Sequence, residues 1–273
     1  MTGIAAIAIC EFKIALRNRW VAIAVVIMAL FAAVLSAAGS APSGELGVDK
    51  LSLTVASLTS LAVYLVPLVA LLMAFDAISG EQERGTLPLL LTYPVSRLEI
   101  LLGKFVAHLG TLALAIAVGY AIAALAALAF DGEAVQGLPA LARLYLTSLL
   151  LGAAFLGLGY AISAVAARPG AAAGAAIAAW LMLIVLYDLA LLAGVVADDG
   201  GAFTRSVFPW LLLANPADAF RLYNLAASEG TSAATGLGGA AQTISPGLAL
   251  VSVAAWSVIA IGLAAAAFRS VKP

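Results

Sequence analysis

The sequence predicts an all-α polytopic membrane protein, and three observations lead to that prediction. Of its 273 residues 64% are hydrophobic and only 10% are charged, whereas soluble domains carry about 25% charged residues. Inside a bilayer, only helices and closed barrels satisfy their backbone hydrogen bonds. The apolar stretches here are long and continuous rather than alternating, which favours helices. We expect a single transmembrane domain over residues 1–273.

Six charge-poor stretches each reach the about 20 residues that a membrane-crossing helix needs. An even number of spans puts both termini on one side, and most Lys and Arg residues lie in the inner connections if that side is the cytoplasm. We therefore expect a bacterial inner-membrane protein with cytoplasmic N- and C-termini. The spans are expected at residues 20–39, 54–75, 105–130, 144–167, 171–197 and 247–268.

The N-terminal residues 1–19 are too polar to cross the membrane but carry many apolar side chains. We predict an interfacial elbow helix that turns into the first span at Trp20, although a frayed extension of that span is an alternative. The basic start and the small residues at 36–41 also fit a signal peptide. Its cleavage would leave five spans and place Arg269 and Lys272 outside, against the charge rule.

The connection at residues 77–104 is short and charged, and it lies between two spans. Ser79 with Gln82, and Ser96 with Glu99, each fit a capping box at a helix start. Gly85 suits the end of the first short helix. We interpret the segment as a rigid set of capped helical turns that a partner can push. It also holds four leucines, which we expect to meet the membrane surface or a partner.

ATP-binding and hydrolytic motifs are absent from the sequence. Gly80 and Gly85 have the glycine spacing of a phosphate loop, but Thr86 follows where the loop needs a lysine. There is no H-E-x-x-H zinc motif and no G-x-S-x-G nucleophile motif. We therefore expect no catalytic residue and no directly bound cofactor, so ATP-driven work would need a second polypeptide.

Residues 80–104 resemble the signature of ABC-2-type exporter permeases, E-x-x-x-G-T-L followed by P-V-S-R-x-E-I-L-L-G-K. The resemblance implies six spans, an elbow helix and a homodimer. It also implies a coupling helix that docks on a separate cytoplasmic ABC ATPase, which uses ATP and Mg. The residues that it assigns to ATPase coupling are Glu81, Glu83, Arg84, Gly85, Thr86, Leu87 and Arg97.

Residues 57–81, 89–97 and 209–225 resemble the membrane subunits of ABC transporters that mature nitrous oxide reductase. This closer resemblance implies a role in denitrification, in assembling the copper–sulfide centre of that enzyme. It further implies two extracytoplasmic partners, a repeat protein and a copper lipoprotein chaperone.

Copper binding by the chain itself finds little support in the sequence. Soft Cu(I) prefers Cys and Met, with His as a further ligand. The chain has one cysteine, Cys10, one histidine, His108, and four scattered methionines. We expect no metal site, although an approach of Cys10 to His108 stays open. The transported species could be copper, a sulfur compound or nothing at all.

Asp188 is an acid placed about ten residues from the outer end of the fifth predicted span. Charged residues at such depths are costly and face the protein interior. We predict that Asp188 and Tyr187 line the transport path or its gate, and pairing of Asp188 across a twofold axis would stabilise its charge. A structural, hydrogen-bonded acid is the alternative. Gly170 and Gly174 form a small-residue face that suits a dimer contact.

The outer segment, residues 198–246, is longer than a simple connection needs. Asn215 followed by Pro216 predicts a helix start, and an apolar run with Trp210 precedes it. We expect two short re-entrant helices that gate the path or hold an outer partner, or else a surface loop with one helix. Phe220 and Tyr223 should share a face, with Arg221 and Asn224 pointing elsewhere.

The function that this pattern favours is the permease subunit of an ATP-driven ABC exporter embedded in the lipid bilayer. A secondary transporter would need internal repeats and several buried ionisable groups. A membrane anchor for an extracytoplasmic protein is a further alternative, and intramembrane catalysis is disfavoured by the missing motifs. The sequence has no basic block, so we expect no nucleic-acid partner.

Overall fold

The computed structural model describes residues 3–16, 50–130, 132–226 and 244–271, together with Val26, Leu30 and Val34. The described residues contain helices and no strand. In chain order the elements are α1 (Gly3–Leu16), α3 (Lys50–Ala74), α4 (Ser79–Glu83), α5 (Thr86–Leu90), α6 (Arg97–Phe130), the 3₁₀-helix η2 (Gly132–Gly137), α7 (Leu138–Val165), α8 (Pro169–Trp180), the π-helix η3 (Leu181–Leu186), α9 (Tyr187–Asp198), the π-helix η4 (Phe203–Val207), α10 (Phe208–Ala214), α11 (Pro216–Ala226) and α14 (Pro246–Ser270).

Five helical runs in the described part are long and apolar enough to cross a membrane. They match the last five predicted spans, so the all-α polytopic fold is confirmed. The first predicted span, residues 20–39, lies outside the described residues apart from three positions. The five runs are Thr54–Glu83, Arg97–Ala129, Val135–Val165, Pro169–Asp198 and Pro246–Ser270.

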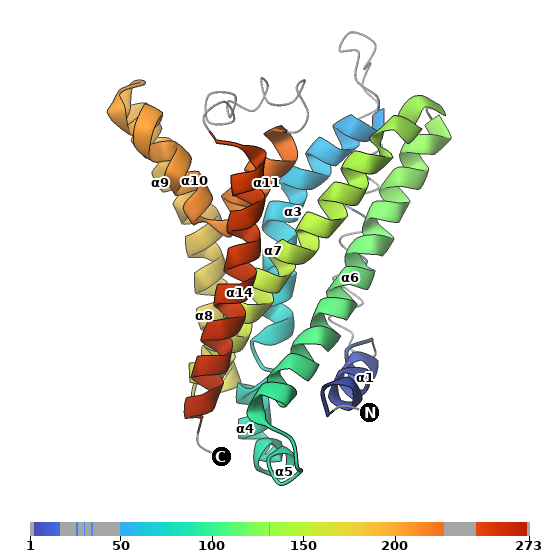
Figure 1. The fold of residues 1–273 in the computed structure, drawn as a ribbon, viewed down its shortest axis with the longest axis vertical. Coiled ribbons are helices and arrows are strands. Elements are labelled where there is room, and N and C mark those ends of the chain that lie inside the picture. The colour runs from blue at the N-terminus through green and yellow to red at the C-terminus, as the bar shows by residue number, and fades with distance from the viewer. Residues whose placement is uncertain are drawn as a thin grey trace.

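Helix α7 is the centre of the bundle and packs against α14, α3 and α6 (Figure 1). Glycines on α7 allow these close contacts. A β-carbon added at Gly157 would lie 2.8 Å from the β-carbon of Ala260 on α14, and one at Gly159 would lie 2.7 Å from that of Ala74 on α3. Small residues at such positions let membrane helices approach closely.

The run α8–η3–α9 leaves the bundle at an angle, and α10 returns along α9 (Figure 1). Helix α11 then enters the bundle and packs against α14, α3 and α7. The short helices α4 and α5 lie at the opposite end of the molecule, where the chain also ends (Figure 1). We call these two ends the α4–α5 end and the α9–α10 end.

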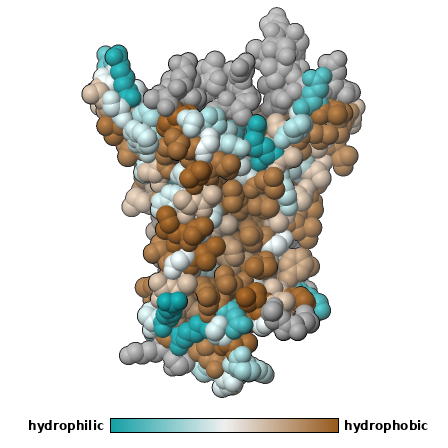
Figure 2. Space-filling model, viewed as in Figure 1, coloured by the Kyte–Doolittle hydropathy of each residue, from teal (hydrophilic) through white to brown (hydrophobic). Residues whose placement is uncertain are grey.

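An apolar band covers the middle of the molecule, with polar patches toward both ends (Figure 2). Large apolar side chains are exposed along the long helices, including Val106, Leu125, Leu146 and Val258. Such a surface suits a hydrocarbon environment, in which apolar side chains need no cover from water.

Helix α1 packs against the start of α6 and is seen nearly end-on in Figure 1. A β-carbon at Gly103 would lie 2.7 Å from Ile7, so the absence of a side chain there lets α1 sit on α6. Ile9 and Ile14 on the other side of α1 are 46% and 59% exposed. The predicted N-terminal helix is therefore confirmed over Gly3–Leu16, with one packed face and one apolar exposed face.

Candidate coupling site and outer gate

Gly85 separates the two short helices of the predicted coupling segment. Its φ of +68° is left-handed, and α5 begins directly after it at Thr86. The predicted break at Gly85 and restart at Thr86 are therefore confirmed. A side chain at Gly85 would strain the backbone, because L-residues rarely adopt this conformation.

The capping box predicted at Ser79 is wrong. The residue before α4 is Ile78, and no side chain of the local sequence caps the helix. Instead, the backbone N–H groups of Ile78 and Ser79 both donate to Oγ of Ser163 on α7, at 3.0 Å each. The Ser79 hydroxyl lies 3.2 Å from Ser163 Oγ and donates to the Phe75 carbonyl. Helix α4 is thus capped by a different helix.

The capping box predicted at Ser96 and Glu99 is confirmed. The Ser96 N–H donates to Oε2 of Glu99 at 2.8 Å, and the Glu99 N–H donates to Oγ of Ser96 at 3.2 Å. These reciprocal bonds satisfy backbone donors that a helix start leaves free. They fix the start of α6 at Arg97.

Lys104 on α6 bridges two carboxylates in what we call the inner cluster: Glu11, Glu81 and Lys104. Its Nζ lies 2.5 Å from Oε1 of Glu11 on α1 and 2.6 Å from Oε1 of Glu81 on α4. The side chains of Lys104, Glu11 and Glu81 are 5%, 20% and 11% exposed. The cluster therefore joins three helices, and Glu81 lies behind the molecular surface rather than on it.

Several side chains of the coupling segment are presented outward, and we call them the docking surface. Leu87, which belongs to α5, is by contrast fully buried. Leu89 and Tyr93 are 64% and 66% exposed, which is high for large apolar and aromatic side chains. An exposed apolar group rimmed by charges marks an interaction site. The docking surface consists of Glu83, Arg84, Gly85, Thr86, Leu89 and Tyr93.

Arg97 connects the start of α6 to the end of α14. Its Nη1 donates to the carbonyl oxygens of Phe268 at 2.9 Å and Val271 at 2.6 Å. Its guanidinium also lies 5.6 Å from the ring centre of Phe268. Arginine near a helix C-terminus satisfies carbonyls that the helix leaves free. Arg97 thus anchors the segment to the bundle.

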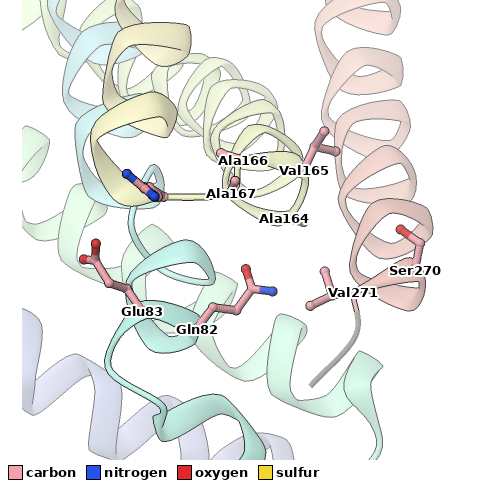
Figure 3. A pocket seen from close by; sticks show the side chains of 9 residues that line it. Gln82, Glu83, Ala164, Val165, Ala166, Ala167, Ser270 and Val271 are labelled. Atoms are coloured by element: carbon pink, nitrogen blue, oxygen red, sulfur yellow. The ribbon is translucent and has the colours of Figure 1, made fainter.

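A cavity of about 530 Å³ adjoins the docking surface (Figure 3). It lies between α4, the α7–α8 turn and the end of α14, and it shares Glu83 with the docking surface. The docking surface is therefore continuous with a hollow that a partner's side chain could enter. The cavity is lined by Gln82, Glu83, Ala164, Val165, Ala166, Ala167, Arg168, Ser270 and Val271.

Toward the α9–α10 end, Asp188, Arg221 and Asp218 form a second ion-pair cluster, the outer cluster. Nη2 of Arg221 on α11 lies 2.9 Å from Oδ2 of Asp188 on α9, and its Nη1 lies 3.3 Å from Oδ1 of Asp218. Arg221 therefore points at α9, a partner that the sequence did not identify. Asp188 thus has an ionic partner within its own chain, and its pairing across a twofold axis stays a prediction.

Asp218 is the most buried member of the outer cluster, with a side chain only 2% exposed. Helix α11 lies outside the five candidate spans. Burial raises the pKa of Asp218 above its ordinary value, and the nearby Asp188 carboxylate raises it further, while Arg221 opposes the shift. Sequence reasoning missed both Asp218 and Arg221 as site residues. A signal was available, because an acid inside a span, such as Asp188, needs a cation as its partner. Arg221, three residues after Asp218 on the same helix, could have been considered as that cation.

The predicted start of α11 is confirmed. Oδ1 of Asn215 accepts a hydrogen bond from the N–H of Ala217 at 2.9 Å, and Pro216 is the first helical residue. Nδ2 of Asn215 donates to the Leu183 carbonyl in η3 at 2.6 Å. In a π-helix the hydrogen bonds between residues four apart, as in an α-helix, are replaced by bonds between residues five apart. The Asn215 side chain adds a hydrogen-bond donor to one carbonyl of this stretch. Tyr187 completes the contact by donating to the Leu211 carbonyl at 2.7 Å.

The remaining faces of α11 also contact protein. Phe220 is fully buried, and Asn224 is 3% exposed. Nδ2 of Asn224 donates to Oγ1 of Thr147 on α7 at 3.0 Å, so Asn224 also faces protein. Tyr223 packs partly buried against a small cluster, whereas Trp210 on α10 is 64% exposed. Trp210 is therefore the member of the predicted outer set that is free to meet a partner.

Comparison with known proteins identifies the family. A family model described as "ABC-2 family transporter protein" matches residues 5–272. The chain belongs to the ABC-2 family of transporter proteins. It is 44% identical over 262 residues to the "Probable ABC transporter permease protein NosY" of Pseudomonas aeruginosa PAO1, and 43% identical over 263 residues to a protein of the same name from Stutzerimonas stutzeri. Each alignment covers 95% of both chains.

Membership of the ABC-2 family confirms the resemblance seen in residues 80–104, and the fold is that of a multi-pass membrane protein. In this ABC-2 protein Gly170 and Gly174 are exposed on α8, with no atom within 4 Å of where a β-carbon would be. The small-residue face is thus open on the outside of the bundle, and its role in a dimer stays a prediction.

The two residues considered for copper lie in different settings. Cys10 is exposed on α1, whereas Nδ1 of the half-buried His108 lies 2.7 Å from the Tyr160 hydroxyl. Across the described ranges, no group of three or more His, Cys, Asp or Glu side chains could hold a metal ion. His108 is therefore described as a hydrogen-bonded residue of this ABC-2 bundle.

Proposed function

We propose that this ABC-2 protein is the permease subunit of an ATP-driven exporter, moved by a separate ATPase that uses ATP and Mg. The observation that carries the proposal is the docking surface. It is exposed, while the side chains that support it are held by hydrogen bonds and ion pairs to the long helices. Glu83 and Arg84 offer charges of both signs, and Leu89 and Tyr93 offer apolar area beside them. A mixed surface of this kind fits a protein partner.

Three contacts connect the docking surface to the long helices. Ser163 bonds the start of α4 to α7, and Lys104 bonds Glu81 of α4 to α6 and, through Glu11, to α1. Arg97 bonds the start of α6 to the end of α14. A displacement of α4 by the ATPase would therefore move four helices together, which is how we propose that ATP hydrolysis drives the permease.

The proposal places the docking surface in the cytoplasm, with both termini on that side of the bacterial inner membrane. It also includes a homodimer that meets along the open small-residue face of α8, at Gly170 and Gly174. At the α9–α10 end, Asp188 and Tyr187 would belong to the transport path or gate. Exposed Trp210 would meet an extracytoplasmic partner.

The biological role that we propose is maturation of the copper–sulfide centre of nitrous oxide reductase. It is supported by the likeness to two proteins named NosY and by the matching stretches at residues 57–81 and 209–225. The outer partners would be a repeat protein and a copper lipoprotein chaperone. The permease would pass a sulfur species or mechanical force rather than copper, since its Cys and Met residues are scattered.

Site-specific photo-cross-linking tests the proposal. The chain is expressed together with a candidate ABC ATPase subunit from the same organism, with a cross-linking residue at Arg84 or, as the control, at Asp199. Both positions are exposed, but Asp199 lies at the α9–α10 end. We expect capture of the ATPase at Arg84 only. Capture at Asp199, or none at Arg84, would contradict the proposal and favour a membrane anchor without ATPase coupling.

A further inference from the structure

The outer cluster has more negative than positive groups. Two carboxylates, Asp188 and Asp218, share the single guanidinium of Arg221. Oδ1 of Asp218 faces Arg221, whereas Oδ2 is buried and has no hydrogen-bond partner among the described residues. A buried carboxylate oxygen without a donor or a cation is strongly unfavourable. A proton on this carboxyl group would remove the cost, because the protonated oxygen is then a donor and carries no charge.

The neighbouring helices do not supply that donor. On α9, the Tyr187 hydroxyl is already used, because it donates to the Leu211 carbonyl. On α3, the Tyr64 hydroxyl makes no hydrogen bond to Oδ2 of Asp218. Helix α10 and the part of α14 before Arg269 contain no ionisable residue.

Helix α7 carries Arg143, which lies one turn before Thr147. Thr147 bonds to Asn224, which is six residues, or about 9 Å, along α11 from Asp218. Arg221 is therefore the cation that acts on Asp218 among the described residues.

We infer that Asp218 holds a proton, which it shares with Asp188, and that the outer cluster is thereby a proton-loaded latch between α11 and α9. With the proton in place, Oδ2 of Asp218 becomes a donor and Arg221 balances the one remaining carboxylate, so the cluster is neutral. Like-charged carboxylates that share a site commonly keep one proton between them. The raised pKa of Asp218 agrees with this arrangement.

The latch links opening to proton release. When the latch opens far enough for water to reach Asp218, the pKa of Asp218 returns toward the ordinary value of about 3.9, so the proton leaves. By linkage, a lower pH on that side favours the closed latch, and a higher pH favours the open one. The inference concerns α9 and α11 alone, and it does not depend on the ATPase.

Infrared spectroscopy of the purified full chain in lipid nanodiscs tests whether the proton is present. We expect a carboxylic-acid C=O band at neutral pH in the spectrum of the unaltered chain minus that of Asp218→Asn. The difference is used because Glu81 in the inner cluster also has a buried oxygen without a hydrogen-bond partner among the described residues. The matched control is Asp199→Asn, because Asp199 is exposed and its φ of +43° suits asparagine. Asp188→Asn should also remove the band, since it leaves Asp218 as the only acid beside Arg221. The same carboxylic-acid absorption in the unaltered chain and in Asp218→Asn would overturn the inference.

Hydrogen exchange of the α11 peptide tests the linkage itself. After correction for the intrinsic pH dependence of exchange, protection of Pro216–Ala226 in the unaltered chain should fall as pH rises from about 4 to about 8, and it should level off once Asp218 ionises in the closed state. One linked proton shifts the opening equilibrium by up to about tenfold per pH unit. Asp218→Asn should show no such fall and Asp199→Asn should keep it. The same pH dependence in all three proteins would rule out a proton-loaded latch.

Discussion

The inner and outer clusters carry the same balance of charges but differ in residue types, burial and ion-pair distances. Each has two carboxylates around one base, and each leaves one buried carboxylate oxygen without a hydrogen-bond partner, on Glu81 and on Asp218. The inner base, Lys104, is 5% exposed, and its two ion pairs measure 2.5 and 2.6 Å. The outer base, Arg221, is 21% exposed, and its pairs measure 2.9 and 3.3 Å.

The difference between the clusters lies in what they join. Lys104 connects three separate helices, α1, α4 and α6, so its removal would affect all of them at once. Arg221 connects only α11 to α9, because its second partner, Asp218, is on its own helix. A tight junction of three helices suits the transmission of a push. A looser contact between two helices suits a part that opens.

The largest expected effect comes from Lys104→Met, which leaves two buried carboxylates without their cation. Removing one partner of a buried ion pair costs about 3–5 kcal/mol. We expect a large fall in the free energy of unfolding, measured in detergent by thermal or denaturant unfolding. The control is Lys13→Met on the exposed side of α1. Equal stability of the two variants would show that the inner cluster is not a structural junction.

A smaller loss is expected from Arg221→Met in the outer cluster. Asp188 and Arg221 are 27% and 21% exposed, so water screens part of the interaction. We expect a loss of about 1–2 kcal/mol in the same unfolding measurement. The ranking of the two variants is the result that matters, because a larger loss for Arg221→Met would reverse the comparison drawn above.

The pH dependence of stability sharpens the comparison further. Since the pKa of Asp218 is raised in the folded chain, the folded state keeps a proton that the unfolded state has lost above about pH 4. Stability should therefore fall as pH rises, by at most about 1.4 kcal/mol per pH unit, until Asp218 ionises in the folded state as well. Unfolding measured across pH should show this slope in the unaltered chain and in Asp199→Asn. Asp218→Asn should lack it, and parallel curves would contradict the prediction.

The smallest effect is expected from Ser163→Ala, which removes the cap that α7 provides to α4. A neutral hydrogen bond or helix cap contributes about 1 kcal/mol. We expect a similar loss of stability, with faster hydrogen exchange at the amides of Ile78 and Ser79. Ser60→Ala is the control, because Ser60 is exposed and bonds only within its own helix. Unchanged exchange at both amides would show that α4 is held by Lys104 alone.

Features set by neighbouring residues could be predicted from the sequence. The spans follow from runs of apolar residues, and Ser96 with Glu99 forms its capping box within four residues. Gly85 marks the break between α4 and α5 because few other residues accept its conformation. Asn215 caps α11 through a bond to a residue two positions later.

Features that depend on distant residues could not be predicted in the same way. Ser79 has the local pattern of a cap, yet Ser163, 84 positions away, takes that role. Asp188 could be identified from the sequence as an acid that is costly in a membrane. Its partner Arg221 is 33 positions away, and only the packing of α11 in the bundle shows that the two side chains meet. The π-helix η3 has no sequence signal that we recognise. One-dimensional patterns identify a group that needs a partner, and the packing decides which partner it has.

The bond from Arg97 to the end of α14 has a practical consequence. The carbonyl oxygens of Phe268 and Val271, at the end of α14, accept hydrogen bonds from the first residue of α6, 171 and 174 positions earlier. An affinity tag or fluorescent protein joined directly after Val271 would begin at this attachment, in the wall of the cavity that Gln82 and Glu83 also line. A fusion at this point therefore risks obstructing the docking surface, and a long spacer should precede it.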